Sequence, residues 1–229
     1  IGMIVTFILT FFLLEHPFSF LPSDQGRAFA VNGSLSKGKL RGVGFIFVLC
    51  FLISSVLFLP LDVEYVIYGI LLFAMMISGY LDDASKTPWN EYKKGLIDLV
   101  ISVVAVLTYM NFNSTTICFG ADEIVIPKAL FLILGVILIW VSVNVTNCTD
   151  GVDGLCASLC SVTLLAFGVL FAPILQKYAM ANFLFLSVLF AYLYFNSSPS
   201  SMLMGDAGSR ALGFYIAVIA LKSTHPFIY

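Results

Sequence analysis

Long apolar runs separated by short polar segments dominate the chain. Most of the runs approach the roughly 20 mostly apolar residues that a helix needs to cross a bilayer. Helix is the predicted structure because backbone polar groups in lipid must pair within their own segment, and barrel strands would alternate instead. The pattern predicts eight membrane helices, the first of them partial, over residues 1–14, 43–60, 64–81, 95–112, 128–146, 155–172, 179–195 and 209–222.

The polar connections fall into two sets that alternate along the chain. One set is 15–42, 82–94, 147–154 and 196–208; the other is 61–63, 113–127 (compatible with a small β-hairpin), 173–178 and the tail after 222. Lys and Arg gather in the first set, which is therefore predicted to be cytoplasmic by the positive-inside rule. With the adjoining helix ends, its basic residues are Arg27, Lys37, Lys39, Arg41, Lys86, Lys93, Lys94 and Arg210, against Lys128, Lys177 and Lys222 in the second set.

Composition supports an all-α integral membrane protein. Hydrophobic residues make up 60% of the chain and charged residues 10%, whereas about a quarter of a soluble domain is charged. The net charge of -2 gives no indication of a nucleic-acid partner. The five cysteines are odd in number and lack metal-site spacing, so no disulfide framework is expected. We expect one transmembrane domain over residues 1–229, incomplete at both ends because Ile1 lies within an apolar run.

Three polar motifs lie in the predicted cytoplasmic set. Residues 79–86, G-Y-L-D-D-A-S-K, place two adjacent carboxylates at a helix end. Because adjacent carboxylates repel, Asp82 and Asp83 favour a cation or a shared proton. With Lys86 and Lys94 nearby, they suit a magnesium-dependent phosphate site, in which acids hold the metal and lysines hold phosphate oxygens. Taken alone, the motif is equally typical of a charge cluster that marks the end of a membrane helix.

The second motif, residues 144–155, has the sequence N-V-T-N-C-T-D-G-V-D-G-L. Such polarity at a membrane boundary is costly unless the groups are paired or solvated. Gly151 and Gly154 permit close approach of the backbone, and the helix that follows offers free amide groups to a phosphate or ribose oxygen. A solvated turn capped by Asn and Asp is the alternative interpretation. The polar candidates are Asn144, Asn147, Asp150 and Asp153.

The third motif, residues 195–210, has the sequence F-N-S-S-P-S-S-M-L-M-G-D-A-G-S-R. Pro199 breaks one helix, and Gly205, Asp206, Gly208 and Ser209 start the next. Asp206 suits either a helix cap or a metal-phosphate cradle. A helix bundle can gather the three motifs into one acidic cleft. Asp98, early in the helix 95–112, either faces that cleft or pairs with Lys94 one turn before it.

In this order, the motifs resemble the polyprenyl-phosphate N-acetylhexosamine-1-phosphate transferase superfamily. The similarity is greatest to its phospho-MurNAc-pentapeptide translocase branch. That branch has a D-D-x-x-K run, matched by residues 82–86, and N-x-x-N-x-T-D-G-x-D-G-L, matched by residues 144–155. Its F-N…M-G-D-x-G-S pattern is matched by Phe195-Asn196 and by residues 204–209. The chain departs from the family at Leu203, where an aromatic residue is usual, and at residues 40–44, which replace a P-T-M-G-G stretch. It also lacks the family's histidine-rich loop.

The resemblance implies a ten-helix enzyme that transfers phospho-MurNAc-pentapeptide from UDP-MurNAc-pentapeptide to undecaprenyl phosphate, giving lipid I and UMP in peptidoglycan synthesis. It implies a homodimer in the bacterial inner membrane, with the active site on the cytoplasmic side. Asp206 is implied to hold Mg²⁺, and Asp82 and Asp83 to orient or deprotonate the acceptor. The other implied substrate-binding residues are Lys86 and Lys94 for phosphate charge, Asn144, Asn147, Asp150 and Asn196 in the polar cleft, and Gly151, Val152 and Asp153 at the uridine.

Three other functions fit parts of the pattern. A GlcNAc-1-phosphate transferase of the same superfamily is disfavoured by Lys86 and Thr149. An intramembrane aspartyl protease would have Gly at the position of Leu203 and a second aspartate in the middle of a helix. A transporter would place ionisable groups near the midplane of the membrane, whereas these acids cluster at one interface.

Overall fold

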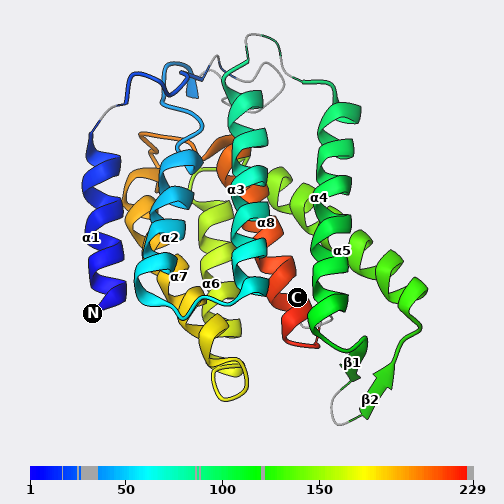
Figure 1. Cartoon of the computed structure of the whole chain (residues 1–229). Coiled ribbons are helices and arrows are strands. Elements are labelled where there is room, and N and C mark those ends of the chain that lie inside the picture. The colour runs from blue at the N-terminus through cyan, green and yellow to red at the C-terminus, as the bar shows by residue number, and fades with distance from the viewer. Residues whose placement is uncertain are drawn as a thin grey trace.

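The computed structural model describes residues 1–16, 18–24, 26, 36–85, 87, 89–119 and 122–225. In these residues the chain forms a bundle of eight helices with one antiparallel hairpin (Figure 1). The elements are α1 (Gly2–Glu15), α2 (Gly44–Phe58), α3 (Val63–Asp83), α4 (Glu91–Phe112), β1 (Thr116–Phe119), β2 (Asp122–Val125), α5 (Lys128–Thr149), α6 (Leu155–Leu170), α7 (Gln176–Asn196) and α8 (Gly205–Lys222).

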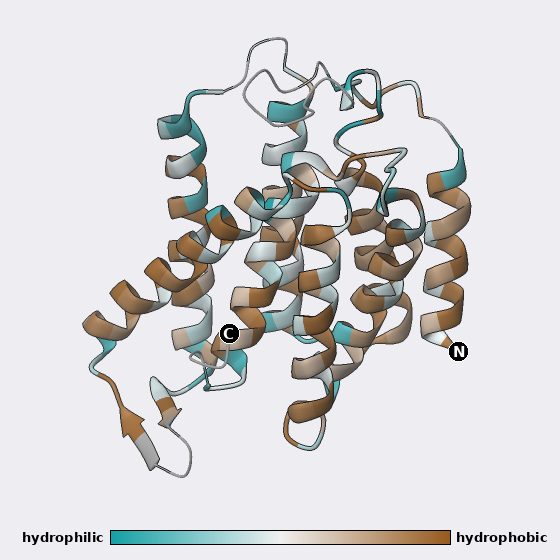
Figure 2. Ribbon diagram, turned by 180° about the vertical axis from the view of Figure 1, so that it is seen from behind, coloured by the Kyte–Doolittle hydropathy of each residue, from teal (hydrophilic) through white to brown (hydrophobic). Residues whose placement is uncertain are grey.

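The structure confirms the all-helical membrane architecture. Four helices, α3, α4, α5 and α7, are long and apolar enough to cross a membrane, and α1, α2 and α6 are apolar but shorter. Apolar residues cover the helices, whereas polar ones concentrate at helix ends and connections (Figure 2). The hairpin within 113–127 is also confirmed, with Thr116 opposite Val125. At the end that carries the motifs, the predicted ranges of α3 and α8 are too short by two and four residues. There α3 continues through Asp83, and α8 begins at Gly205, which the third motif placed at a helix start, rather than at residue 209.

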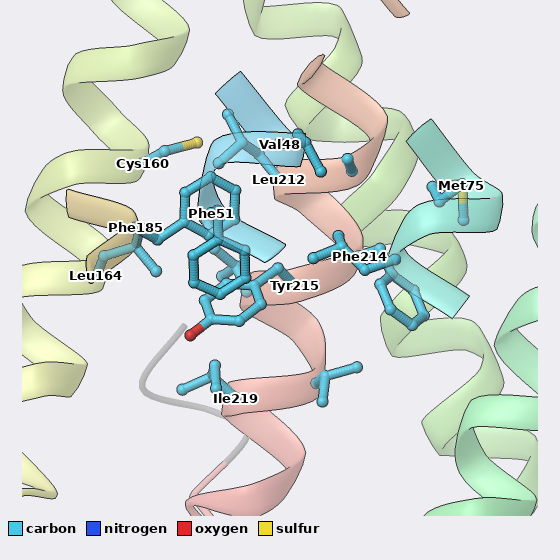
Figure 3. Packing of buried hydrophobic residues seen from close by; sticks show 14 of the residues in the cluster. Val48, Phe51, Met75, Cys160, Leu164, Phe185, Leu212, Phe214, Tyr215 and Ile219 are labelled. Carbon is cyan, nitrogen blue, oxygen red and sulfur yellow. The ribbon is translucent and has the colours of Figure 1, made fainter. Parts of the chain in front are cut away.

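Helix α8 lies at the centre of the bundle and packs on α2, α3, α4, α5 and α6. All of its residues are buried, including the charged Asp206, Arg210 and Lys222. Its middle meets an aromatic cluster in which Phe51 stacks on Phe185 with ring centroids 4.1 Å apart (Figure 3). The Tyr215 ring meets both phenylalanines edge-on, and its hydroxyl donates to Asn182 Oδ1 at 2.9 Å. A helix that is enclosed on every side can carry charges only where partners meet them.

Glycines bring three helices into backbone contact with α8. A Cβ on Gly44 of α2 would lie 2.1 Å from Gly208 N, and one on Gly79 of α3 would lie 2.4 Å from the carbonyl of Asp206. On α8 itself, a Cβ on Gly213 would lie 2.7 Å from the Ser142 carbonyl oxygen of α5. Small residues at helix contacts are typical of membrane bundles, because close packing replaces the hydrophobic effect as the driving force between helices. Asp206 is thereby held tightly against the end of α3.

We expect Gly79→Ala to destabilise the bundle. The added methyl group overlaps the backbone of Asp206, so α3 and α8 must separate, at a cost of about 1–3 kcal/mol in the free energy of unfolding. Gly69→Ala on the same helix is the matched control, since its Cβ would meet only Leu52 Cδ2, at 3.8 Å. Thermal unfolding in detergent measures both variants. Equal unfolding temperatures for the two would contradict the close contact.

A second buried polar cluster lies at the opposite end of α8, away from the motifs. Lys222 Nζ lies 3.1 and 3.0 Å from the two carboxylate oxygens of Glu64 and donates to Asn113 Oδ1 at 2.6 Å. Asn113 Nδ2 and the Tyr68 hydroxyl donate to Glu64 Oε1 at 2.7 and 3.1 Å. The cluster joins α3, α4 and α8 where α8 ends.

Candidate active site

The two acids at the end of α3 face different cations. Asp82 Oδ2 lies 2.7 Å from Lys94 Nζ, and its Oδ1 accepts the backbone N–H of Trp89 at 2.7 Å. Asp83 Oδ1 accepts from Arg41 Nε at 2.9 Å, and its Oδ2 accepts from Ala207 N at 3.0 Å. Both carboxylates are buried. Each of the two adjacent acids therefore lies against its own cation, Lys94 for Asp82 and Arg41 for Asp83.

Asp206 lies between the same two cations in the first turn of α8. Its Oδ2 is 3.3 Å from Lys94 Nζ, and its Oδ1 is 3.5 Å from Arg41 Nη2. The preceding Gly205 adopts a positive φ of 68°, and a Cβ there would lie 2.3 Å from Asp83 Oδ2. Only glycine therefore lets α8 begin so close to the acids of α3. Three buried carboxylates and two half-buried cations form one network.

Arg41 is a site residue that the motifs did not reveal. Its segment pairs with the third motif through hydrogen bonds from Leu203 N to Leu40 O at 2.8 Å and from Gly44 N to Met204 O at 3.0 Å. Burial opposes the charge on Arg41, but the carboxylates of Asp83, Asp206 and Asp24 outweigh it and raise the pKa of the guanidinium. In the sequence, Arg41 is simply one of the basic residues that precede α2, and it lies in the stretch that departs from the family pattern. Nothing in that stretch marks it as a partner of the acids.

The second motif joins the network through Asn147. Its Nδ2 donates to Ser209 Oγ at 2.9 Å. The Ser209 hydroxyl in turn donates to the carbonyl of Gly205, one turn earlier on α8, at 2.9 Å. Asp150 ends α5, and its backbone N–H donates to Asn147 O at 3.2 Å. The structure thus brings the second motif to the start of α8, beside Asp206.

Asn196 and Asp153 hold the second and third motifs together. Asn196 is buried; its Oδ1 accepts from Gly154 N at 3.0 Å and its Nδ2 donates to Met202 O at 3.0 Å. Asp153 accepts from Ser200 N at 3.0 Å and from Ser200 Oγ at 2.8 Å, with Lys39 Nζ at 3.8 Å. Burial opposes its ionisation, but these donors together outweigh it and hold the pKa of Asp153 below its usual value. Both side chains fix the shape of the loops.

The remaining predicted residues lie outside this network. Asn144 is exposed, and its Nδ2 donates to Trp140 O on its own helix at 2.7 Å. Gly151 and Val152 are exposed on the loop between α5 and α6, where a ligand from solution can reach them. Lys86 lies outside the described residues. Asp98 was predicted either to face the cleft or to pair with Lys94. In the structure its ion-pair partner is instead Arg210 of α8.

The donor set is compatible with a magnesium ion held partly by a substrate. Among the residues that the structure describes, no three His, Cys, Asp or Glu side chains are grouped to bind a metal by themselves. Mg²⁺ commonly takes only one or two carboxylates and completes its coordination with phosphate oxygens and water. Asp82 and Asp206 share Lys94 between them and so present two carboxylates together.

An apolar groove runs along α5 on the outside of the bundle. Its volume is about 610 Å³. The lining begins at Ile117 and Leu221, continues along α5 past Leu138 and ends at Val145, two residues before Asn147 in the sequence. Such a groove suits a hydrocarbon chain, and its end at Val145 lies within the second motif.

Comparison with known proteins gives one family and one recurrent name. The family model described as "Glycosyl transferase family 4" matches residues 65–224. A phospho-N-acetylmuramoyl-pentapeptide-transferase from Treponema pallidum (strain Nichols) is 35% identical over 250 aligned positions, covering 100% of this chain and 69% of the relative. Proteins of the same name from Microcystis aeruginosa and Dictyoglomus turgidum are 31% and 27% identical, covering 80% and 95% of this chain and 53% and 72% of the relatives.

Proposed function

Because this chain belongs to glycosyl transferase family 4, we propose that it transfers phospho-MurNAc-pentapeptide from its UDP donor to undecaprenyl phosphate, giving lipid I and UMP. The observation that carries the proposal is the network in which the buried Asp82, Asp83 and Asp206 meet the half-buried Lys94 and Arg41. These groups come from distant parts of the sequence and meet where membrane helices end. A reaction between a soluble nucleotide and a membrane lipid needs a polar site at that place.

In the proposed reaction, an oxygen of the acceptor phosphate attacks the β-phosphorus of the donor, and UMP leaves. Lys94 and Arg41 bind phosphate oxygens and stabilise the charge that spreads over them in the transition state. Asp206, with Asp82 beside it, would hold Mg²⁺, which supplies further positive charge to the pyrophosphate. Asp83 holds Arg41 in place and, with Asp82, orients the acceptor phosphate.

The loops and the groove complete the proposed site. Asn147 and Asp150 are proposed to line the polar part of the site beside Asp206, and Asn196 keeps the second and third motifs in register. The exposed Gly151 and Val152, with Asp153 beside them, offer a surface for the uridine. Lys86, outside the described residues, is proposed to add charge for the phosphates. The groove along α5 would take the isoprenoid chain. We further propose a homodimer in the bacterial inner membrane, with this site at the cytoplasmic face.

A transfer assay on the full-length protein in detergent tests this function. Undecaprenyl phosphate and Mg²⁺ are supplied with either UDP-MurNAc-pentapeptide or UDP-GlcNAc, and UMP release is followed. We expect UMP from the pentapeptide donor alone, its loss on addition of EDTA and its return with excess Mg²⁺. Release from UDP-GlcNAc would assign the chain to the sister activity. No UMP from either donor with folded protein would refute the proposal, and UMP release that resists EDTA would refute its metal requirement.

A further inference from the structure

Two pairs of opposite charges lie one helical turn apart between α4 and α8. Helix α4 carries Lys94 and then Asp98, and α8 carries Asp206 and then Arg210. Lys94 Nζ lies 3.3 Å from Asp206 Oδ2, and one turn deeper Arg210 Nη2 forms an ion pair with Asp98 Oδ1. The signs alternate, so each helix presents one positive and one negative charge to the other. Only the first pair belongs to the proposed reaction site.

The deeper pair is poorly suited to stabilising the fold. Asp98 and Arg210 are each 2% exposed, and burying two charges costs about as much as their attraction returns. In addition, Arg210 Nε and Nη1 have no hydrogen-bond partner in the part of the chain that the structure describes. A buried donor without a partner is destabilising. An apolar pair of similar size would hold the helices together at lower cost.

The pair does have a use in the geometry of the site. Helices α3 and α5 pack extensively on α8, whereas α4 packs on α3 and α5 and meets α8 only sparsely. Lys94 is on α4 and Asp206 is on α8, so their separation is set across this sparse contact. Lys94 is also drawn to Asp82, at 2.7 Å, and to the exposed Glu91, at 3.7 Å. The Asp98–Arg210 ion pair, one helical turn away, holds α4 and α8 together next to the point where Lys94 reaches Asp206.

We propose that Asp98 and Arg210 are positioning residues, which hold Lys94 against Asp206 so that both meet the phosphates of the substrates. The inference rests on the proposed transferase function. Displacing a charged group by about 1 Å can cost about 100-fold in rate. Because Lys94 would act on charge that develops in the transition state, its displacement lowers kcat more than it raises KM.

The decisive variant replaces both partners, Asp98→Leu with Arg210→Leu. The apolar pair removes two buried charges, so we expect thermal stability in detergent equal to or above that of the native protein. We nevertheless expect kcat for UMP release to fall about 10- to 100-fold, with KM for the UDP donor changed less than about threefold. Native kcat in a stable double variant would overturn the inference.

Single variants separate positioning from general loss of stability. Arg210→Met is matched with Lys222→Met, which breaks the other buried ion pair of α8, to Glu64 at its far end. Both should unfold at lower temperature, but only Arg210→Met should lose kcat by about 10-fold or more. Arg210→Lys keeps the charge within reach of Asp98 and should recover most of the rate. Equal loss of kcat in the two methionine variants, or no recovery in Arg210→Lys, would refute positioning.

A structure of the double leucine variant gives a readout that needs no transfer. We expect the distance from Lys94 Nζ to Asp206 Oδ2 to exceed the 3.3 Å of the native protein and the ion pair to be lost. An unchanged distance would overturn the inference even if the native protein were inactive. Conversely, a native protein that releases no UMP would refute the proposed function and leave this structural result to stand on its own.

Discussion

Asp206→Asn is expected to lower the rate of UMP release by about 10³-fold while the protein remains folded. The carboxylate of Asp206 faces both Lys94 and Arg41 at the start of α8, and it is the residue that we propose for Mg²⁺. Asparagine has nearly the same size, so the close contact between Gly79 and the backbone of Asp206 is preserved. The charge is lost, and with it both the attraction for a metal and the alignment of the two cations.

The matched control for this substitution is Asp62→Asn. Asp62 caps α3 at the other end, where its Oδ1 accepts from Tyr65 N at 2.8 Å and its partner Lys177 is near the surface. Asparagine caps a helix about as well as aspartate, so activity should stay within about twofold of the native rate. The comparison is made by UMP release at saturating substrates. A rate for Asp206→Asn within tenfold of the native protein would rule out the proposed role.

Arg41→Gln is expected to weaken the fold as well as the activity. Arg41 meets Asp83, Asp206 and Asp24 at once, with Nε at 2.9 Å from Asp83 Oδ1 and two other nitrogens at 3.5 Å from the remaining acids. Without the guanidinium, the buried Asp83 and Asp24 lose this cation, and Asp206 keeps only Lys94. Removing one partner of a buried ion pair lowers the free energy of unfolding by about 3–5 kcal/mol. We expect the lower end, about 3 kcal/mol, because 31% of the Arg41 side chain is exposed and water screens part of the interaction.

Arg41→Lys separates charge from shape. Lysine keeps the positive charge, but its single ammonium group cannot reproduce the planar fork that contacts three acids. We therefore expect an intermediate unfolding temperature and a transfer rate closer to that of Arg41→Gln than to that of the native protein. Chemical unfolding in detergent and UMP release measure the two effects. If Arg41→Gln unfolds like the native protein, the network does not depend on Arg41.

Most of the fold was predictable because the membrane imposes one structure on long apolar runs. The predictions were least accurate where charges lie inside helices. Asp82 and Asp83 were placed just beyond a helix that in fact includes them, and α8 starts four residues before its predicted boundary, so that Asp206 is within its first turn. A charged residue ends an apolar run in the sequence and so ends the predicted helix. In the structure the helix continues through such a residue when a partner of opposite charge meets its side chain.

The convergence of the three motifs was predicted, and the structure confirms that Asp82, Asp83, Asp206 and Asn147 gather at one end of the bundle. Arg41 and the pairing of Asp98 with Arg210 were not predicted, because each joins elements far apart in the sequence. Neither helical periodicity nor local spacing encodes such a contact. The structure also assigns Asn196 to holding two loops together, which its position after Phe195 did not indicate.

The charges along α8 also restrict how this protein can move. One end of the helix is anchored by Arg210 to α4, and the other by Lys222 to α3. A slide of α8 along its own axis by one turn, about 5.4 Å, would break both anchors together and leave four charges without partners in an apolar surrounding. We therefore expect α8 to keep its axial position when substrates bind. The groove along α5 lies on the outside of the bundle, so an isoprenoid chain can enter it from the side without moving α8.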